Sequence, residues 1–241
     1  MSRLLLLALL AAPAAPPDPT ALLQRAEKAV LGENAVYTMR MSVQRPGKPE
    51  RVVEMKGFKK GDERGLLRYT DPPKERGTAY LRVAGSTWLW LPSAEKAVRV
   101  GAKQNFGGGD FSNGDIFRLS LSRDYVATLA GAESALGQEC WKLELKARDR
   151  SVAYDRVLMW VRRDGTDFPV RIEYFTLSGR KLKWLTFSDV GRLGAHTRPR
   201  LLVMESALES GQRTELRFLA IDDNPRLEDR LFTPSALERG E

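Results

Sequence analysis

The chain has 241 residues, of which 42% are hydrophobic and 29% are charged, and this composition excludes a disordered protein and predicts a sizeable packed core. One cysteine excludes a disulfide framework, and one histidine argues against a histidine-based zinc centre or a Ser-His-Asp triad. The formal charge is +8, but basic residues alternate with acidic ones instead of forming a stripe, so we expect no nucleic-acid partner.

Residues 1–14 have the features of a secretory signal peptide. Arg3 precedes a short apolar run from Leu4 to Leu10, and small residues continue to Ala14, where we expect cleavage. The run is much shorter than the roughly 20 residues needed to cross a bilayer, and no cysteine follows it as a lipid attachment site. The sequence therefore predicts a soluble periplasmic protein, exported by this leader, with one mature domain over residues 15–241.

A helix and a hairpin are predicted at the start of the mature chain. Residues 20–32 carry apolar side chains at helical spacing, with Thr20 placed to cap the helix and Gly32 to end it. From residue 35 to residue 44 the apolar positions alternate with polar ones, which is the period of a strand with one buried face. The turn at 45–49 contains Pro and Gly and leads into a second alternating run at 53–56, so we expect a β-hairpin.

The same alternation, interrupted by short turns, continues to the end of the chain, for example at 140–147 and on both sides of the Asp164-Gly165 turn; residues 232–234 are typical of a helix edge. We count about ten or eleven strands with no long linker. The predicted fold is therefore mainly antiparallel β: a single curved sheet forming an unclosed (half) β-barrel, with short helices as a lid over its concave side.

Residues 103–121 break the strand pattern. The glycines at 107–109 suggest a phosphate-binding loop, but the Lys-Ser/Thr that ends such loops is missing, and so is the spacing of a dinucleotide-binding motif. We expect a flexible entry to a short helix, with Ser112 or Asn113 near its cap, packed over the sheet.

If the sheet curls, its concave side forms an apolar trough. Five of the six methionines lie in predicted strands, and flexible thioethers suit irregular apolar ligands. The predicted ligand-binding residues are Tyr37, Met39, Met41, Val53, Met55, Leu67, Tyr69, Leu81, Trp88, Trp90, Trp141, Leu143, Met159, Ile172, Tyr174 and Trp184. The predicted lid residues are Leu22, Leu23, Ala26, Val30, Phe111, Ile116 and Phe117.

Several segments resemble the outer-membrane lipoprotein-sorting-protein family, which is similar to the periplasmic lipoprotein carrier. These segments are residues 65–73, 76–81, 87–92, 96–99, 106–115, 154–163, 168–170, 174–175 and 179–183, and together they extend over nearly all of the mature chain. The resemblance implies an unclosed β-barrel that is covered by helices and holds acyl chains in an apolar cavity.

The resemblance also implies a function: a non-enzymatic periplasmic carrier or acceptor of lipids or lipidated proteins. Its candidate partners are lipid or lipoprotein acyl chains, an inner-membrane exporter and an outer-membrane acceptor, and we expect a monomer. The alternative is a lipid-sensing or interaction module on the same fold that regulates a membrane partner. The excess of basic over acidic residues and the Arg162-Arg163 pair suggest this alternative.

A third interpretation is enzymatic. Asp110 and Asp115 form a carboxylate pair beside the glycine run, and His196 is a candidate base. The simpler interpretation is that the acids lie in a turn and at a helix start, and that His196 lies in a solvated connection. Cys140 fits a small buried hydrophobe, and no G-x-S-x-G motif is present. We therefore predict no catalytic residue, no metal and no cofactor.

Overall fold

The strands join into one continuous antiparallel sheet. The computed structural model describes residues 15–117, 121–149 and 152–239, so the predicted leader at 1–14 lies outside the described residues. The sheet has thirteen strands in the order β6-β5-β4-β3-β2-β1-β13-β12-β11-β10-β9-β8-β7. Most neighbours in the sheet are also neighbours in the sequence; the exception is β1, which pairs with β13 and so joins the two ends of the chain in mid-sheet.

The bounds of the strands are β1 Asn34–Gln44, β2 Arg51–Lys60, β3 Arg64–Asp71, β4 Ala79–Val83, β5 Ser86–Leu91, β6 Lys96–Val100, β7 Tyr125–Ala135, β8 Gln138–Ala147, β9 Arg156–Arg162, β10 Pro169–Phe175, β11 Lys181–Leu193, β12 His196–Ser206 and β13 Arg213–Asp222. The antiparallel class is confirmed, and the expected hairpin is β1–β2. The count of ten or eleven was wrong. Strand β7 escaped detection because it is an edge strand, rich in Ala, Gly and Ser, and most of its residues are exposed.

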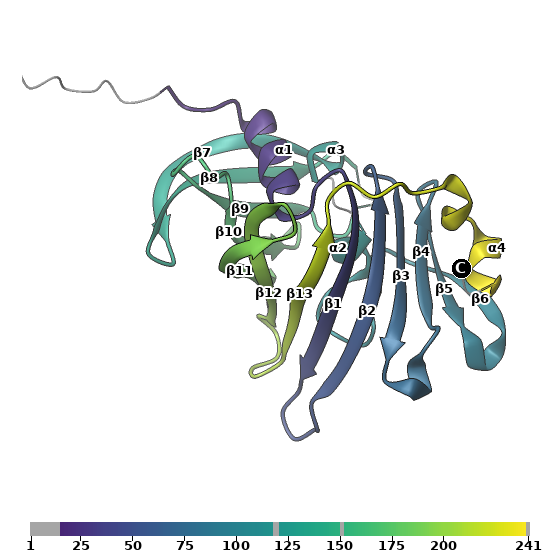
Figure 1. Cartoon of the computed structure of the whole chain (residues 1–241). Coiled ribbons are helices and arrows are strands. Elements are labelled where there is room, and N and C mark those ends of the chain that lie inside the picture. The colour runs from purple at the N-terminus through teal and green to yellow at the C-terminus, as the bar shows by residue number, and fades with distance from the viewer. Residues whose placement is uncertain (1–14, 118–120, 150–151, 240–241) are drawn as a thin grey trace, which may run out of the picture.

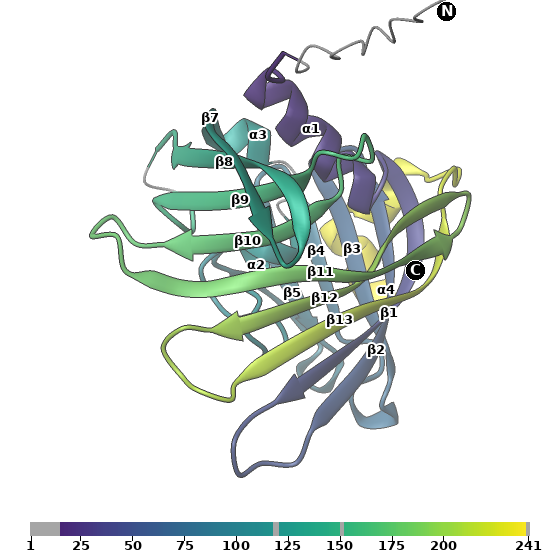
Figure 2. The same ribbon diagram turned by 90° about the vertical axis from the view of Figure 1, so that its left-hand side faces the viewer.

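The sheet is strongly curved and does not close. In Figure 1 the strands β1 to β6 form one wall, and the strands toward β7 turn away from it. Figure 2 shows β8 to β12 crossing in front of β2 to β5 at a steep angle. The main hydrophobic core lies between these two halves, because it combines buried side chains from β1–β3 with others from β8–β12.

Helix α1 (Pro19–Val30) lies along one opening between the two halves (Figure 1). Asp18 caps it, since its Oδ1 accepts a hydrogen bond from the backbone N of Ala21 at 2.7 Å, so the expected cap at Thr20 was wrong by two residues. Leu22, Leu23 and Ala26 are fully buried against the sheet, and α1 contacts β7, β10 and β12. No helix in the described segments is both long and apolar enough to cross a membrane.

The glycine-containing segment enters the space between the two halves of the sheet. It leads into the short helices α2 (Asn113–Phe117) and α3 (Leu121–Asp124). As expected, Ser112 caps α2: its Oγ accepts from the backbone N of Asp115 at 3.1 Å, and the Asp115 carboxylate accepts from the backbone N of Ser112 at 2.7 Å. Phe106, Phe111 and Phe117 are buried in the main core, so this segment fills the part of the trough that β1–β4 form.

A second, smaller core lies on the opposite face of β3–β5. The C-terminal helix α4 (Pro234–Arg239), which starts at the expected helix edge, contacts β4, β5 and β6 there. Leu66, Ala79 and Leu81 are buried in this second core together with Phe232 and Leu237. Because α4 covers the outer face, strands β4 and β5 are apolar on both sides.

Candidate functional site

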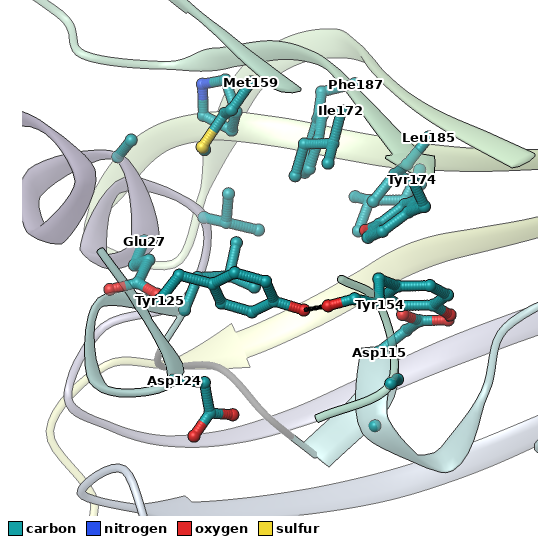
Figure 3. Close-up of a pocket in the computed structure, with 17 residues that line it drawn as sticks. Glu27, Asp115, Asp124, Tyr125, Tyr154, Met159, Ile172, Tyr174, Leu185 and Phe187 are labelled. Carbon is teal, nitrogen blue, oxygen red and sulfur yellow. Dashed lines mark hydrogen bonds between the residues drawn. The ribbon is translucent and has the colours of Figure 1, made fainter. Parts of the chain in front are cut away.

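A cavity of about 110 Å³ lies between α1 and the inner face of β9–β12. Its volume is several times the ~10–15 Å³ that one water molecule needs. Figure 3 shows Met159, Ile172, Leu185 and Phe187 along one wall, facing Tyr125 and Tyr154. The complete lining is Ala26, Glu27, Val30, Gly114, Asp115, Leu121, Asp124, Tyr125, Ala153, Tyr154, Met159, Pro169, Ile172, Tyr174, Leu185, Phe187 and Leu202. Most of these side chains are apolar, so the cavity suits a hydrocarbon chain.

One end of the cavity is closed by a hydrogen-bonded ion pair. The Lys183 ammonium lies 2.7 Å from Oδ2 of Asp115 and donates to the carbonyl oxygen of Asp110 at 2.6 Å. The same Asp115 oxygen accepts from the Tyr154 hydroxyl at 3.0 Å. The side chains of Lys183 and Asp115 are only 12% and 4% exposed, so this network links β11 to the start of α2 in a nearly dry environment.

Tyrosines form the floor beside this ion pair. The rings of Tyr154 and Tyr174 lie 4.5 Å apart, and the Tyr125 hydroxyl donates to the backbone carbonyl of Tyr154 at 3.0 Å (Figure 3). Burial raises the pKa of Tyr154 and of Tyr174 well above the ordinary value, and the nearby Asp115 charge adds to the effect. Both phenols are therefore neutral at any physiological pH.

Glu27 of α1 lies at the other end of the cavity. Its carboxylate accepts hydrogen bonds from the backbone N of Ser122 at 3.2 Å and from the Ser122 hydroxyl at 2.9 Å, which ties α1 to α3. Burial raises the pKa of Glu27 from 4.5 to about 7, against the opposing effect of the Ser122 hydrogen bonds. The protonation of this carboxyl therefore changes close to neutral pH.

Two buried cations hold the C-terminal end of α1. Arg198, which is 2% exposed, donates to the carbonyl oxygen of Val30 at 3.3 Å and pairs with Asp223. Lys59 donates to the carbonyl oxygens of Gly32 at 2.8 Å and Glu33 at 3.0 Å. Cations at this position satisfy the last carbonyl groups of a helix and match its dipole. Helix α1, which covers the cavity, is therefore held in place at its C-terminal end.

The predicted ligand-binding residues fall into three groups. Met159, Ile172 and Tyr174 line the cavity. Nine others do not line the cavity: Trp141 packs against the main core, and eight belong to it, namely Tyr37, Met39, Met41, Val53, Met55, Leu67, Tyr69 and Leu143. The remaining four, Leu81, Trp88, Trp90 and Trp184, lie outside this core.

For Leu81, Trp88 and Trp90, the expected position on the concave face is wrong. These residues pack in the second core near α4, whereas the next residues along, Tyr80 and Leu89, face the main core. Alternation could not decide between the two faces because α4 makes the outer face apolar as well.

Trp184 was also expected to face the cavity, but it points to the opposite side of β11 from its neighbour Leu185. Its indole N–H donates to Glu205 at 2.8 Å, and the Arg171 guanidinium lies over its ring, whereas Leu185 lines the cavity.

Of the predicted lid residues, Ala26 and Val30 line the cavity. Leu22, Leu23, Phe111, Ile116 and Phe117 are packed in the main core instead. The predicted lining did not include Leu185, Phe187 and Leu202, although Leu185 and Phe187 alternate in the strand pattern that contains Trp184. Glu27 was not predicted either, because nothing in the sequence marks a carboxylate on a helix surface as partly buried.

The candidate catalytic groups are engaged in structural contacts or isolated. Asp110 accepts from the Thr214 hydroxyl at 2.6 Å and from the Gln212 amide, Asp115 pairs with Lys183, and His196 is exposed at the turn between β11 and β12. Burial raises the pKa of Cys140, which is the opposite of what a reactive thiol needs. The described residues contain no group of three or more His, Cys, Asp or Glu side chains that could hold a metal ion.

Three solved structures have this fold over nearly the whole chain. A LolA-superfamily protein from Nitrosomonas europaea is 28% identical, with a TM-score of 0.80, and the match covers 92% of this chain and 100% of that one. A DUF1329-family protein from Desulfovibrio piger is 25% identical, with a TM-score of 0.81 and coverage of 90% and 97%. A putative outer-membrane lipoprotein-sorting protein domain from Vibrio parahaemolyticus is 22% identical, with a TM-score of 0.78 and coverage of 92% and 98%.

A family model described as "Uncharacterized protein" matches residues 61–239, and no curated protein matches the sequence. The matched region contains the eleven strands β3 to β13 and every cavity-lining residue except Ala26, Glu27 and Val30, while α1, β1 and β2 precede it.

The match extends over well more than half of the chain. The chain therefore belongs to the family of this model, and it shares its fold with the LolA-superfamily protein and with the lipoprotein-sorting protein domain described above.

Proposed function

We propose that the protein is a periplasmic, non-enzymatic carrier or acceptor of lipids or lipidated proteins, which shelters an acyl chain in the cavity beneath α1 for transfer toward the outer membrane. The observation that carries this proposal is the apolar cavity between α1 and β9–β12. Burying one methylene is worth about 0.8 kcal/mol, so a few sheltered methylenes provide useful affinity without a polar anchor. The similarity to a lipoprotein-sorting domain supports the same class of ligand.

With α1 in its present position, the cavity has room for only part of a long acyl chain. Its volume of about 110 Å³ lies below the few hundred Å³ of a typical ligand pocket. Additional space would come from an outward swing of α1 about its C-terminal end, which Arg198 holds at Val30, because α1 contributes Ala26 and Glu27 to the lining. The Glu27–Ser122 hydrogen bonds and the exposed Arg25–Asp167 pair would have to open for this movement.

The first test is native mass spectrometry of the protein purified from a host with a complete cell envelope, in which we expect co-purified lipid. After delipidation, the protein should bind a synthetic lipopeptide or a monoacylglycerol. Leu185→Trp should weaken this binding at least ~10-fold by filling the cavity. Val190→Trp, on the same strand but 38% exposed, is the matched control. A folded, delipidated protein that binds neither ligand contradicts the proposal.

A lipid-sensing module is the second candidate, and the position of α1 favours it. The outer face of α1 exposes Gln24, Arg25 and Lys28, so a ligand that displaces the helix would also change a charged surface. A sensor should change its affinity for a membrane-bound partner when it is loaded with lipid. A carrier should instead transfer its lipid to an acceptor. For a carrier, we propose a monomer with two partners, an inner-membrane exporter and an outer-membrane acceptor.

A further inference from the structure

The ionisable Asp and Glu side chains that line the cavity are not matched by any basic side chain in the described part of its lining. Among its described lining residues are the carboxyl groups of Glu27, Asp115 and Asp124, but no Lys, Arg or His. The other lining residues are apolar, tyrosine or glycine. A cavity for free fatty acids would need a cation or a set of hydrogen-bond donors for the carboxylate. The lining therefore contains acceptors of positive charge and no cationic partner for an anion.

The Asp115 end offers no cation to a ligand. Lys183 lies behind this end, with its ammonium 5.2 Å from the centre of the Tyr154 ring and 5.7 Å from that of Tyr174. Its hydrogen bonds go to Asp115 and to the carbonyl oxygen of Asp110. Because the pair is nearly buried, drawing the ammonium toward a ligand would leave the Asp115 carboxylate without its partner, which is costly.

The Glu27 end carries an excess of carboxyl groups. Asp124 lines the cavity with Glu27, and a neighbouring surface hollow that also contacts Glu27 is lined by Glu33, Asp62, Lys28 and Lys59. Lys59 already donates to two backbone carbonyls and lies 3.9 Å from Asp62. Four carboxyl groups therefore face two ammonium groups in this region.

We propose that the cavity selects hydrocarbon chains with an uncharged or cationic end group and excludes the carboxylates of free fatty acids. This inference rests on the proposed function and specifies the chemical class of its ligand. An ester- or amide-linked acyl chain satisfies the requirement, because its carbonyl is uncharged. A free carboxylate would be desolvated beside Glu27 and Asp124 at one end, where a second negative charge is disfavoured, or beside the neutralised Asp115–Lys183 pair at the other, which offers it no cation.

The test compares three probes with the same twelve-carbon chain: dodecanoate, dodecanamide and dodecylamine. Their affinities for the delipidated full chain are measured by isothermal titration calorimetry below the aggregation concentration of each probe. At about pH 8 we expect dodecanamide and dodecylamine to bind at least ~10-fold more tightly than dodecanoate. At about pH 6 Glu27 is mostly protonated, so we expect dodecanoate to recover part of the difference.

Two variants assign the effect to the carboxylate. Glu27→Gln should strengthen the binding of dodecanoate at about pH 8 and leave that of dodecanamide nearly unchanged. Ser122→Ala removes the hydroxyl that Glu27 accepts from but keeps the charge, so it should preserve the discrimination. If Glu27→Gln does not fold, the pH dependence of the unmodified protein still tests the inference.

The outcomes separate the two proposals. Equal affinity for all three probes, or preference for dodecanoate, overturns the selectivity and leaves the carrier function standing. Binding of none of the three probes, together with no binding of the lipopeptide, overturns the proposed function itself.

Discussion

The Lys183 ammonium and the Asp115 carboxylate lie 2.7 Å apart and are almost completely shielded from solvent. They connect β11 with the start of α2, two segments far apart in the sequence. Removal of either partner alone leaves a buried charge uncompensated. This pair therefore holds the glycine-containing segment in place at one end of the cavity.

Asp115→Asn should lower the free energy of unfolding by about 3 kcal/mol, because Lys183 would remain buried without its counter-charge. Urea unfolding followed by tryptophan fluorescence measures this change. The double variant Asp115→Asn/Lys183→Met should regain part of the loss, since it removes both charges. A double variant that is less stable than Asp115→Asn alone would show that the ion pair is not the source of the effect.

Arg198→Met should loosen the C-terminal end of α1. Arg198 is buried and joins Asp223 to the carbonyl oxygen of Val30, so its loss removes this donor from Val30 and leaves the Asp223 carboxylate, which still accepts from the backbone N of Ala195, without its counter-charge. Hydrogen–deuterium exchange should become faster in α1. Arg200→Met is the matched control, because Arg200 lies two residues along on the same strand and pairs with Asp189 near the surface. Equal acceleration of exchange in both variants would contradict the proposed anchor.

Gly57→Ala should destabilise the sheet by about 1–3 kcal/mol through overpacking. Gly57 of β2 pairs with Tyr37 of β1, and a Cβ at Gly57 would lie 2.2 Å from Cζ of the Tyr37 ring. Thermal unfolding by circular dichroism measures the loss. Gly101→Ala should change stability little, because the nearest atom to its added Cβ is 3.7 Å away. A Gly57→Ala variant as stable as the parent would mean that the tyrosine ring moves aside without cost.

The raised pKa of Glu27 predicts a pH dependence of stability. Its folded-state pKa of about 7 lies above the ordinary value of 4.5, so the folded state binds the proton more tightly than the unfolded state. The contribution is complete below about pH 4.5 and is lost as the pH rises through about 7. Glu27→Gln should therefore reduce the loss of stability over this range, as measured by urea unfolding at several pH values. An identical pH profile for the variant and the parent would contradict the shift.

Local patterns were sufficient for the strands that bury one face. In β1 the alternation of Tyr37, Met39 and Met41 with polar residues predicted both the strand and its inward face. The cap of α2 was expected at Ser112 or Asn113, and Ser112 forms it; this could be expected because capping depends on residues three positions apart. These features follow from interactions between near neighbours, which a sequence displays directly.

The sequence by itself determined the antiparallel class, the main inward-facing strand residues and the family. Only the tertiary structure decided where space remains: the phenylalanines around α2 fill the β1–β4 half, whereas β9–β12 and α1 leave a cavity lined by Leu185 and Leu202. It also decided that Trp88 faces outward and that Glu27 is partly buried beside Ser122. The physical reason is that a cavity, a covered outer face and a desolvated carboxylate each depend on segments that meet only after the sheet has curved.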